Sequence, residues 1–334
     1  MTRIETVAQL EESLSTPTDG LIESLRAIDG DILVLGAGGK MGPTLARMAR
    51  RAKRRVIAVS RFSSQAAADE LRRDGVETIA CDLLDRDAVA RLPDAPNVIF
   101  MAGQKFGTAD SPELTWVMNT VLPAIVAERY AKSRIVVFST ACVYPLAPVA
   151  GPGSREGDPL GPPGEYANSC VGRERVFEHF SKLHGTPALL YRLSYAVDLR
   201  YGVLHDVARK VAGGESVDVS MGFANVIWQG DANARAIQCL AHTNTPPVPL
   251  NVSGPRIAIR ELAHRFGELF GHAPAIIGEE SPTAWVVDPA RSFELFGPLT
   301  VSLDEMIEAT AHWVRLGGAT LGKPTHFDTR DGRF

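Results

Sequence analysis

A glycine-rich turn is the part of the sequence whose residue types and spacing point most directly to a chemistry. In the stretch 31–52 (DILVLGAGGKMGPTLARMARRA), an apolar run ends at this turn and an amphipathic helical pattern follows it. Glycine lets the backbone turn tightly and approach a phosphate, and the free N–H groups at a helix start attract its charge. This order of strand, turn and helix predicts a dinucleotide-binding site. The residues expected to bind the cofactor are Gly36, Gly38, Gly39, Lys40, Met41 and Gly42.

The residues that follow the next apolar runs refine the identity of the cofactor. Ser60 and Arg61 stand where an acidic residue would favour NAD. A hydroxyl beside a guanidinium suits the 2′-phosphate of NADP, so we expect NADP, with NAD as the alternative and a solvated surface arginine as the plain interpretation of Arg61. Asp82 could accept a hydrogen bond from the adenine amino group or cap a helix. The remaining residues expected to line this site are Leu83, Met101, Ala102 and Gly103.

Composition argues against several other classes of function. The 334 residues include 35 basic and 39 acidic ones, and this formal net charge of −4 is too even to indicate binding to nucleic acid or to an anionic membrane. No apolar run approaches the roughly 18 residues that span a bilayer, and the first residues lack the apolar segment of a signal peptide. Four scattered cysteines without CxxC spacing fit a reduced, cytoplasmic protein, and the histidines fit no metal spacing.

Short apolar runs recur along the chain with helical patterns between them. They lie at 32–35, 56–59, 76–80, 97–101, 134–138 and 188–191. This alternation predicts βαβ units and an α/β fold of the Rossmann type, with a doubly wound parallel sheet. We expect three parts: a helical extension at 1–29, a nucleotide domain at 30–194 with an interleaved segment at about 225–245, and a smaller α/β substrate lobe over most of 195–334. The Pro/Gly-rich stretch 145–164 is long enough that we expect it to be functional or disordered.

Several motifs together resemble the extended short-chain dehydrogenases/reductases, specifically the NAD(P)-dependent epimerase/dehydratase family, over about residues 30–315. The glycine spacing at 36, 39 and 42 and the segment 138–144 (FSTACVY) match the family's motifs, and Tyr166 follows at the start of a helix. The resemblance implies that Thr140 and Tyr166 are catalytic, with Tyr166 also contacting the cofactor. It further implies that substrate contacts come from Lys105, Asn119, Thr140 and Cys142.

The sequence departs from the family at Cys170. The family places a lysine four residues after the tyrosine, where it binds the nicotinamide ribose and lowers the tyrosine pKa. Moving a tyrosine pKa from about 10 to near 7 requires roughly 4 kcal/mol of preferential stabilisation of the phenolate, which a thiol does not supply. We therefore expect a neutral Tyr166 unless Lys105 or Arg173 provides the missing cation. Arg173 could instead be a solvated residue or a partner of a nearby glutamate, and the segment 191–198 also lacks the family's usual residues.

Three functions remain open from the sequence. The first is an NAD(P)-dependent oxidoreductase or epimerase acting on a sugar, nucleotide sugar or related polyol or carbonyl compound. The others are an NADP-binding sensor or partner protein with a decayed site, and a non-redox isomerase or lyase on the same fold. The resemblance also implies a homodimer formed through the tyrosine-bearing helix and the helix before it. The side chains available for contact could equally face the sheet, and they are Leu114, Val117, Val121, Ile125 and Val171.

Overall fold

Two N-terminal helices precede the first strand, and each begins at a side-chain cap. In this computed structural model, residues 3–105, 107, 110–323 and 325–333 are described. Helix α1 (Val7–Ser15) begins with a capping box between Thr6 and Gln9, and α2 (Asp19–Arg26) is capped by the Thr18 side chain. The expected extension at 1–29 is thus helical where it is described.

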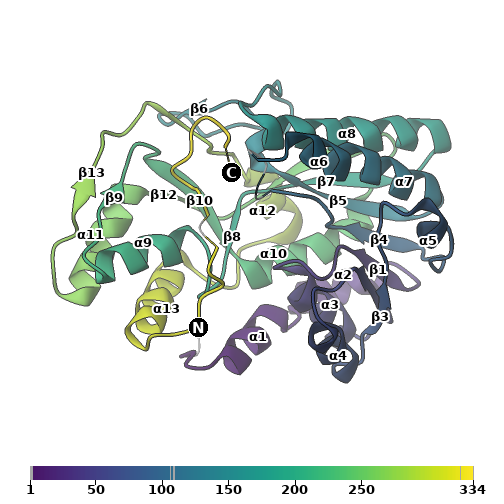
Figure 1. Cartoon of the computed structure of the whole chain (residues 1–334), viewed down its shortest axis with the longest axis horizontal. Helices are drawn as coiled ribbons and strands as arrows, with labels where there is room; N and C mark the ends of the chain where they lie inside the picture. The colour runs from purple at the N-terminus through teal and green to yellow at the C-terminus, as the bar shows by residue number, and fades with distance from the viewer. Residues whose placement is uncertain (1–2, 106, 108–109, 324, 334) are drawn as a thin grey trace.

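The central sheet has seven parallel strands in the order β11-β7-β5-β4-β1-β2-β3 (Figure 1). Each of the six apolar runs supplies one strand, and a seventh strand comes from the C-terminal part of the chain. This arrangement confirms the doubly wound α/β fold. The strands are β1 (Ile32–Leu35), β2 (Val56–Ser60), β3 (Glu77–Ala80), β4 (Asn97–Phe100), β5 (Arg134–Thr140), β7 (Ala188–Leu193) and β11 (Val248–Val252).

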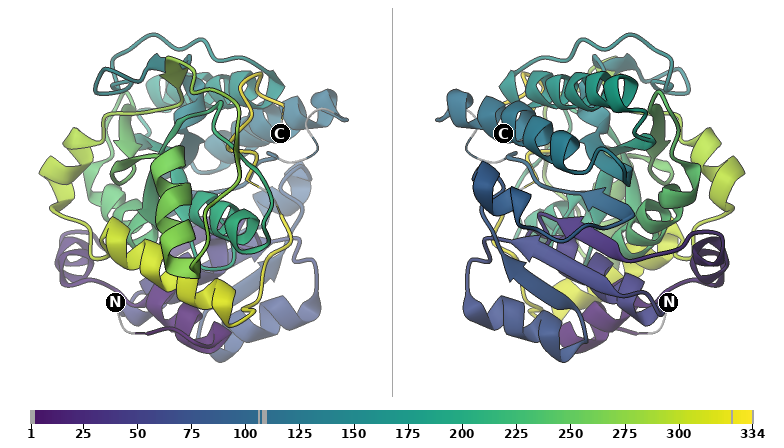
Figure 2. Two further views of the ribbon diagram at one scale, coloured as in Figure 1. Left: turned by 90° about the vertical axis from the view of Figure 1, so that its left-hand side faces the viewer. Right: turned by 90° about the vertical axis from the view of Figure 1, so that its right-hand side faces the viewer.

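Helices cover both faces of this sheet, as Figure 2 shows from two sides. Alternate residues of β1 face opposite layers: Ile32 and Val34 belong to one buried cluster, and Leu33 and Leu35 to another. Within the interleaved stretch expected near 225–245, α10 contacts α3, and the chain then enters β11. The helices around the sheet are α3 (Gly42–Arg51), α4 (Gln65–Arg73), α5 (Arg86–Ala90), α6 (Pro112–Trp116), η1 (Val117–Val121), α7 (Leu122–Arg129), α8 (Glu165–His184), α10 (Gln229–Gln238) and η3 (Cys239–His242).

The smaller lobe is built around a three-stranded sheet, β12-β10-β8, with its own buried cluster. Leu10 and Leu14 of α1 belong to that cluster, so the N-terminal helix packs on the lobe as well as on α3. The elements of the lobe and its margins are η2 (Ala141–Val143), β6 (Ala147–Pro148), β8 (Tyr195–Val197), α9 (Val203–Ala212), β9 (Val217–Asp218), β10 (Phe223–Trp228), β12 (Arg256–Ala258), α11 (Ile259–Phe270), β13 (Ile276–Ile277), β14 (Thr283–Ala284), α12 (Ala290–Phe296) and α13 (Leu303–Arg315).

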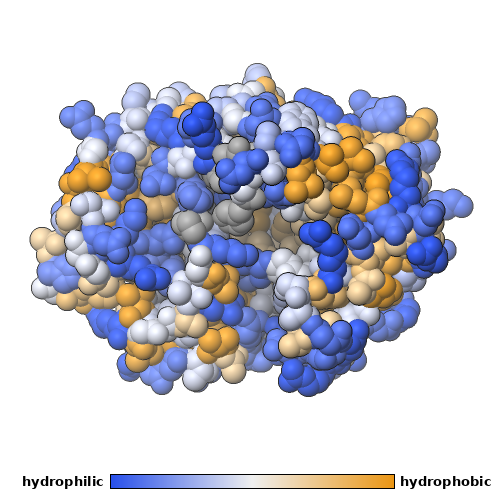
Figure 3. Space-filling view, in the orientation of Figure 1, coloured by the Kyte–Doolittle hydropathy of each residue, from blue (hydrophilic) through white to orange (hydrophobic). Residues whose placement is uncertain are grey.

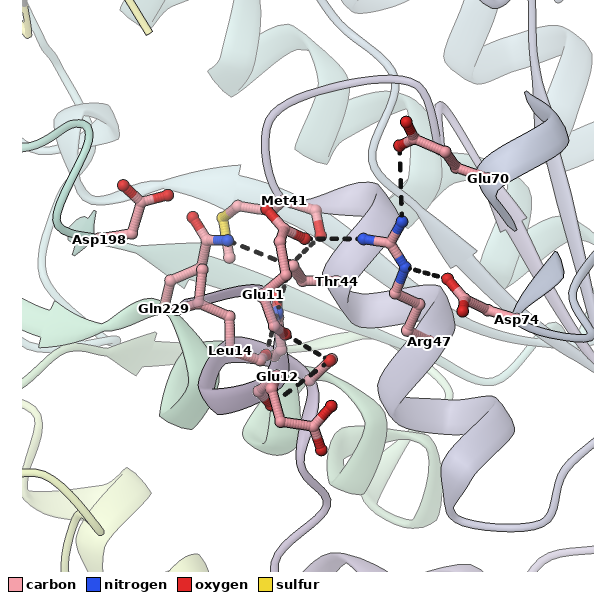
Figure 4. Close-up of polar contacts among 12 residues, drawn as sticks. Glu11, Glu12, Leu14, Met41, Thr44, Arg47, Glu70, Asp74, Asp198 and Gln229 are labelled. Carbon is pink, nitrogen blue, oxygen red and sulfur yellow. Dashed lines mark hydrogen bonds and ion pairs between the residues drawn. The ribbon is translucent and has the colours of Figure 1, made fainter. Parts of the chain in front are cut away.

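Glu11 of α1 links the two lobes through a pair of ion pairs. Its carboxylate lies 2.7 Å from Arg47 of α3 and 2.7 Å from Arg200, which follows β8 in the smaller lobe. Figure 4 shows how Arg47 also points to Asp74, at 2.5 Å, and to Glu70. The extension therefore joins α3 to the smaller lobe.

The Pro/Gly-rich stretch 145–164 is ordered because the smaller lobe holds it. Strand β6 pairs with β14, and Ser154 forms a bridge with Val287. The Asn251 side chain donates a hydrogen bond to the Ser154 carbonyl at 2.9 Å. Of the two expectations for this stretch, disorder is thus wrong, and the stretch instead forms a wall beside the end of β5. In the described part of the chain, none of the helices combines the length and apolar character needed to cross a bilayer.

Candidate active site

The glycine turn is shaped by close contacts at some of its glycines and by open space at another. Gly36 has a φ of +88°, and a Cβ there would lie 2.6 Å from the Ala102 nitrogen. A Cβ at Gly42 would lie 2.4 Å from the Ala37 carbonyl oxygen, so the start of α3 can approach the turn only without a side chain. Gly39 differs, because a Cβ there would meet only the Gly36 oxygen, at 3.5 Å. The space above Gly39 is open to a ligand.

The first of two cavities lies on the side of the turn that faces β2 and β3. This adenosine-side cavity, of about 420 Å³, brings together Ser60, Arg61, Asp82 and Leu83, as the sequence predicted. Arg61 is exposed at its rim. Asp82 accepts a hydrogen bond from the Leu84 backbone at 3.0 Å, while Asp85 is the residue that caps α5. The helix-cap interpretation of Asp82 is therefore wrong.

The second cavity, of about 290 Å³, lies between the turn and the smaller lobe, and we call it the reacting cavity. It shares Gly36, Gly39, Met101 and Gly103 with the first, so the two cavities are continuous along the turn. Thr140, at the end of β5, accepts a hydrogen bond from the Cys142 backbone at 3.1 Å. The predicted residues that line the reacting cavity include Lys40, Met41, Gly42, Lys105, Thr140, Cys142 and Tyr166.

The surroundings of Tyr166 in this cavity favour the neutral form of its phenol. Burial raises its pKa well above the ordinary value, and the Cys170 and Cys142 thiols raise it further, whereas Arg173 and a hydrogen bond with Thr140 lower it. Cys170 is fully buried in an apolar cluster with Val143 and Tyr144, and burial raises the pKa of its thiol too. Cys170 is thus a small packed residue behind the tyrosine.

Arg173 is the buried cation on the tyrosine helix. It donates a hydrogen bond to the Phe138 carbonyl at 2.7 Å and another to the Asn119 side chain. A Cβ on Gly103 would lie 2.0 Å from its guanidinium, so glycine at 103 makes room for it. Its Nε has no hydrogen-bond partner among the described residues, and Arg173 lines the reacting cavity. Both alternatives left open for Arg173 are wrong: the side chain is buried rather than solvated, and Glu174 and Glu178 pair with other arginines.

Asn119 lies behind the cavity wall rather than on it. Its amide accepts a hydrogen bond from the Gln104 nitrogen and donates one to the Gln104 oxygen, both at 3.0 Å, and also donates one to the Ser169 hydroxyl at 2.8 Å. The π-helical turn η1 places it there, and such turns often occur at functional sites. Asn119 therefore holds the loop after β4, and that loop presents Lys105 to the cavity.

Sequence reasoning missed a buried ion pair beneath the cavity. Glu174 of α8 pairs with Arg192 of β7 at 2.7 Å, with side chains 0% and 4% exposed. Ser139 donates a further hydrogen bond to the same carboxylate at 2.6 Å, and Arg192 donates one to the Tyr144 hydroxyl at 2.6 Å. The only sequence signal was an arginine directly after the apolar run 188–191, within what became β7. The pair fixes the tyrosine helix to the ends of β5 and β7.

Lys40 was predicted to bind the cofactor as part of the glycine turn, but its side chain reaches beyond the turn. Its ammonium donates a hydrogen bond to the Ala196 carbonyl at 2.8 Å and lies 4.1 Å from the centre of the Tyr201 ring. The side chain thus crosses from the turn to the smaller lobe. Burial lowers the pKa of Lys40 to about 8. In the described part of the chain, no three histidine, cysteine or acidic residues gather in a way that could hold a metal ion.

The fold and the paired cavities define an α/β protein with a Rossmann-type dinucleotide site and a second lobe across the cleft. A sequence profile of the NAD dependent epimerase/dehydratase family matches residues 32–220, more than half of the chain. The chain therefore belongs to that family. No curated protein matches the sequence significantly.

Solved structures of the same fold cover most of the chain at low sequence identity. UDP-glucose 4-epimerase from Thermus thermophilus, in complex with NAD, is 20% identical with a TM-score of 0.71, over 85% of this chain and 99% of that one. The enzyme WbmG from Bordetella bronchiseptica, in complex with NAD, is 19% identical with a TM-score of 0.73, over 90% and 98%. DesIV, a dTDP-glucose 4,6-dehydratase from Streptomyces venezuelae, is 16% identical with a TM-score of 0.72, over 85% and 97%. At these identities the likeness extends to the fold alone.

Proposed function

We propose that this protein is an NAD(P)-dependent oxidoreductase of the epimerase/dehydratase type that acts on a sugar or a related polyol or carbonyl compound. The observation that carries the proposal is the Thr140–Tyr166 pair, which lies in the same cavity as the glycine turn. Two of the similar structures are named as a UDP-glucose 4-epimerase and a dTDP-glucose 4,6-dehydratase, and this supports a sugar substrate here.

The residues of the cleft fit a dinucleotide. The open space above Gly39 accommodates a pyrophosphate, and the two continuous cavities give room for a nucleoside on either side of it. Ser60, Arg61, Asp82 and Leu83 would bind the adenosine half, with Arg61 favouring NADP over NAD. Lys40, Met41 and Gly42 would contribute backbone contacts, and Tyr166 would lie beside the nicotinamide half.

A neutral Tyr166 favours the reduction of a carbonyl. When bound, the nicotinamide supplies the hydride. Thr140 holds the substrate carbonyl oxygen, and the Tyr166 hydroxyl donates its proton to that oxygen as it becomes an alcohol. The reverse reaction requires Tyr166 to accept a proton as a phenolate, which its raised pKa disfavours. Arg173 is the cation whose charge acts on Tyr166, and it partly offsets the missing lysine.

We further propose that the chain functions as a homodimer with the division of domains expected from the sequence. Leu114 is 43% exposed, Val121 is 45% exposed and Trp116 is 38% exposed. Ile125, by contrast, is buried. Figure 3 shows apolar side chains gathered over the region where α6, α7 and α8 lie in Figure 1. An exposed apolar group of this kind supports pairing through these helices.

The Tyr166→Phe variant tests the proposal. We expect the wild-type protein to bind NADPH and to reduce at least one sugar-type carbonyl, and the variant to lose about 10²- to 10⁴-fold in kcat while it still binds NADPH. Tyr130→Phe is the matched control, because Tyr130 is buried away from the cavity and bonds to the Pro93 carbonyl. NADPH binding without turnover would favour the sensor, and unchanged turnover in Tyr166→Phe would remove Tyr166 from the reaction.

A further inference from the structure

The reacting cavity is lined by cations and by no acidic side chain. Lys40, Lys105 and Arg173 line it, and none of the described residues around it is aspartate or glutamate. The uncharged polar side chains of this cavity, among them Gln104, Ser139 and Ser194, can donate and accept hydrogen bonds but supply no negative charge to balance the three cations. A partly desolvated positive charge is complemented best by an anion.

The two lysines reach this cavity from different elements. Lys40 leaves the glycine turn and bonds to Ala196 of the smaller lobe, so its ammonium lies on the substrate side of the cleft. Lys105 comes from the loop after β4, and its ammonium lies 6.0 Å from the ring centres of both Tyr166 and Tyr195. Both lysines line the same cavity, and the charge of Lys105 acts on Lys40.

Two acidic groups whose charges act on the lysines, Asp198 and Asp206, bond to other residues as well. Asp198 pairs with Arg200 at 3.0 Å, and Arg200 also pairs with Glu11. Asp206 accepts hydrogen bonds from the backbone and the hydroxyl of Thr325, at 2.9 and 2.6 Å. These two carboxylates therefore make the electrostatic potential around the lysines more negative, but they do not line the cavity.

The titration of the lysines agrees with this geometry. Burial and the charges of Arg200 and Lys105 lower the pKa of Lys40, against the opposite effect of Asp198 and Asp206. Burial also lowers the pKa of Lys105, against Cys142, Cys170 and Asp206. Both lysines would regain stabilisation of their charged form if an anion were bound between them.

We propose that the substrate of this protein carries an anionic group, a carboxylate or a phosphate, that binds between Lys40 and Lys105. Because Lys105 lies close to the Tyr166 ring, the anionic group is only a few atoms away from the carbon that faces the Tyr166 hydroxyl. This places the charge on the reacting sugar or polyol itself, as in a sugar acid or a sugar phosphate. The proposal rests on the function proposed above and adds the class of substrate.

Calorimetry on the NADPH-loaded protein tests the proposal with three probes: D-galactose, D-galacturonate and D-galactose 6-phosphate. We expect at least one of the two anionic probes to bind about 10- to 100-fold more tightly than D-galactose, as charge-assisted hydrogen bonds to two lysines would give. Comparing the two anionic probes distinguishes a carboxylate from a phosphate. If neither binds more tightly than D-galactose, the proposal is overturned.

Three variants separate this proposal from the proposed function. Lys40→Met and Lys105→Met should each weaken the preferred anion about tenfold or more, while Lys182→Met, an exposed lysine on α8, should not change it. Each variant is also titrated with NADPH alone. A Lys40→Met protein that loses NADPH but keeps the anion would assign Lys40 to the cofactor and overturn the proposal. Reduction of neutral sugars with no preference for anions would overturn it and leave the proposed function standing.

Discussion

The two halves of the cleft are built by different means. The adenosine-side cavity depends on the backbone of the glycine turn and on space left by missing side chains. The reacting cavity depends on side chains brought together from the turn, two loops and a long helix, over the buried Glu174–Arg192 pair. The adenosine-side cavity is thus encoded by a local sequence motif. The reacting cavity instead depends on charged side chains that the tertiary fold brings together.

Removing the buried charge pair should have the largest effect. Glu174→Gln leaves Arg192 with reduced compensation in the protein interior, so we expect a loss of about 3–5 kcal/mol in the free energy of unfolding. Glu178→Gln, which breaks the exposed pair with Arg175, should cost less than about 1 kcal/mol. Urea unfolding followed by circular dichroism measures both. Equal losses would mean that the pair beneath the reacting cavity has no special role.

Two glycine substitutions should separate ligand space from protein packing in the adenosine half. Gly39→Ala meets no close protein atom, so we expect normal stability and a loss of about 1–3 kcal/mol in NADPH binding through overpacking against the pyrophosphate. Gly42→Ala would collide with the Ala37 carbonyl, so we expect a lower free energy of unfolding as well. Thermal unfolding with and without NADPH measures both. Unchanged NADPH affinity in Gly39→Ala would contradict a pyrophosphate above the turn.

The preference for NADP should depend on Arg61. Replacing it in Arg61→Gln removes the bidentate contact to a 2′-phosphate, so we expect about a 10- to 100-fold loss of NADPH affinity with little change for NADH. Fluorescence titration with each nucleotide gives the ratio, and Arg91→Gln, an exposed arginine outside the cavity, is the control. A wild-type protein that prefers NADH would contradict the role of Arg61.

The smallest expected effect is a pH dependence of anion binding. Lys40 is charged below its pKa of about 8 and neutral above it, so the affinity for the preferred anion should fall as the pH rises through that value. Between pH 7 and pH 9 the fall should be about tenfold or less. Lys40→Arg should flatten the profile because arginine stays charged. A wild-type profile as flat as that of Lys40→Arg would contradict a titrating Lys40 at the binding site.

The sequence predicted the sheet and the adenosine half because both depend on local patterns. Apolar runs and glycine spacing can be identified without knowing the partners of each residue. The main local feature that the sequence did not decide was whether the stretch 145–164 is ordered. The reacting cavity could be predicted only in part. Thr140 and Tyr166 followed from the family motif, but the reach of Lys40 to Ala196 and the pairing of Glu174 with Arg192 join residues 156 and 18 positions apart. Such contacts depend on how the lobes meet.

We propose that Tyr166 stays protonated and acts as a proton donor, because Cys170 stands where the family has a lysine. The most direct test is the pH dependence of single-turnover reduction by the NADPH-loaded protein at saturating substrate, compared with Cys170→Lys. We predict a rate for the wild-type protein that shows no ionisation of Tyr166 between pH 6 and about 9, and an added ionisation in that range for Cys170→Lys. A wild-type rate that falls with an apparent pKa near about 7, and is abolished in Tyr166→Phe, would contradict the account.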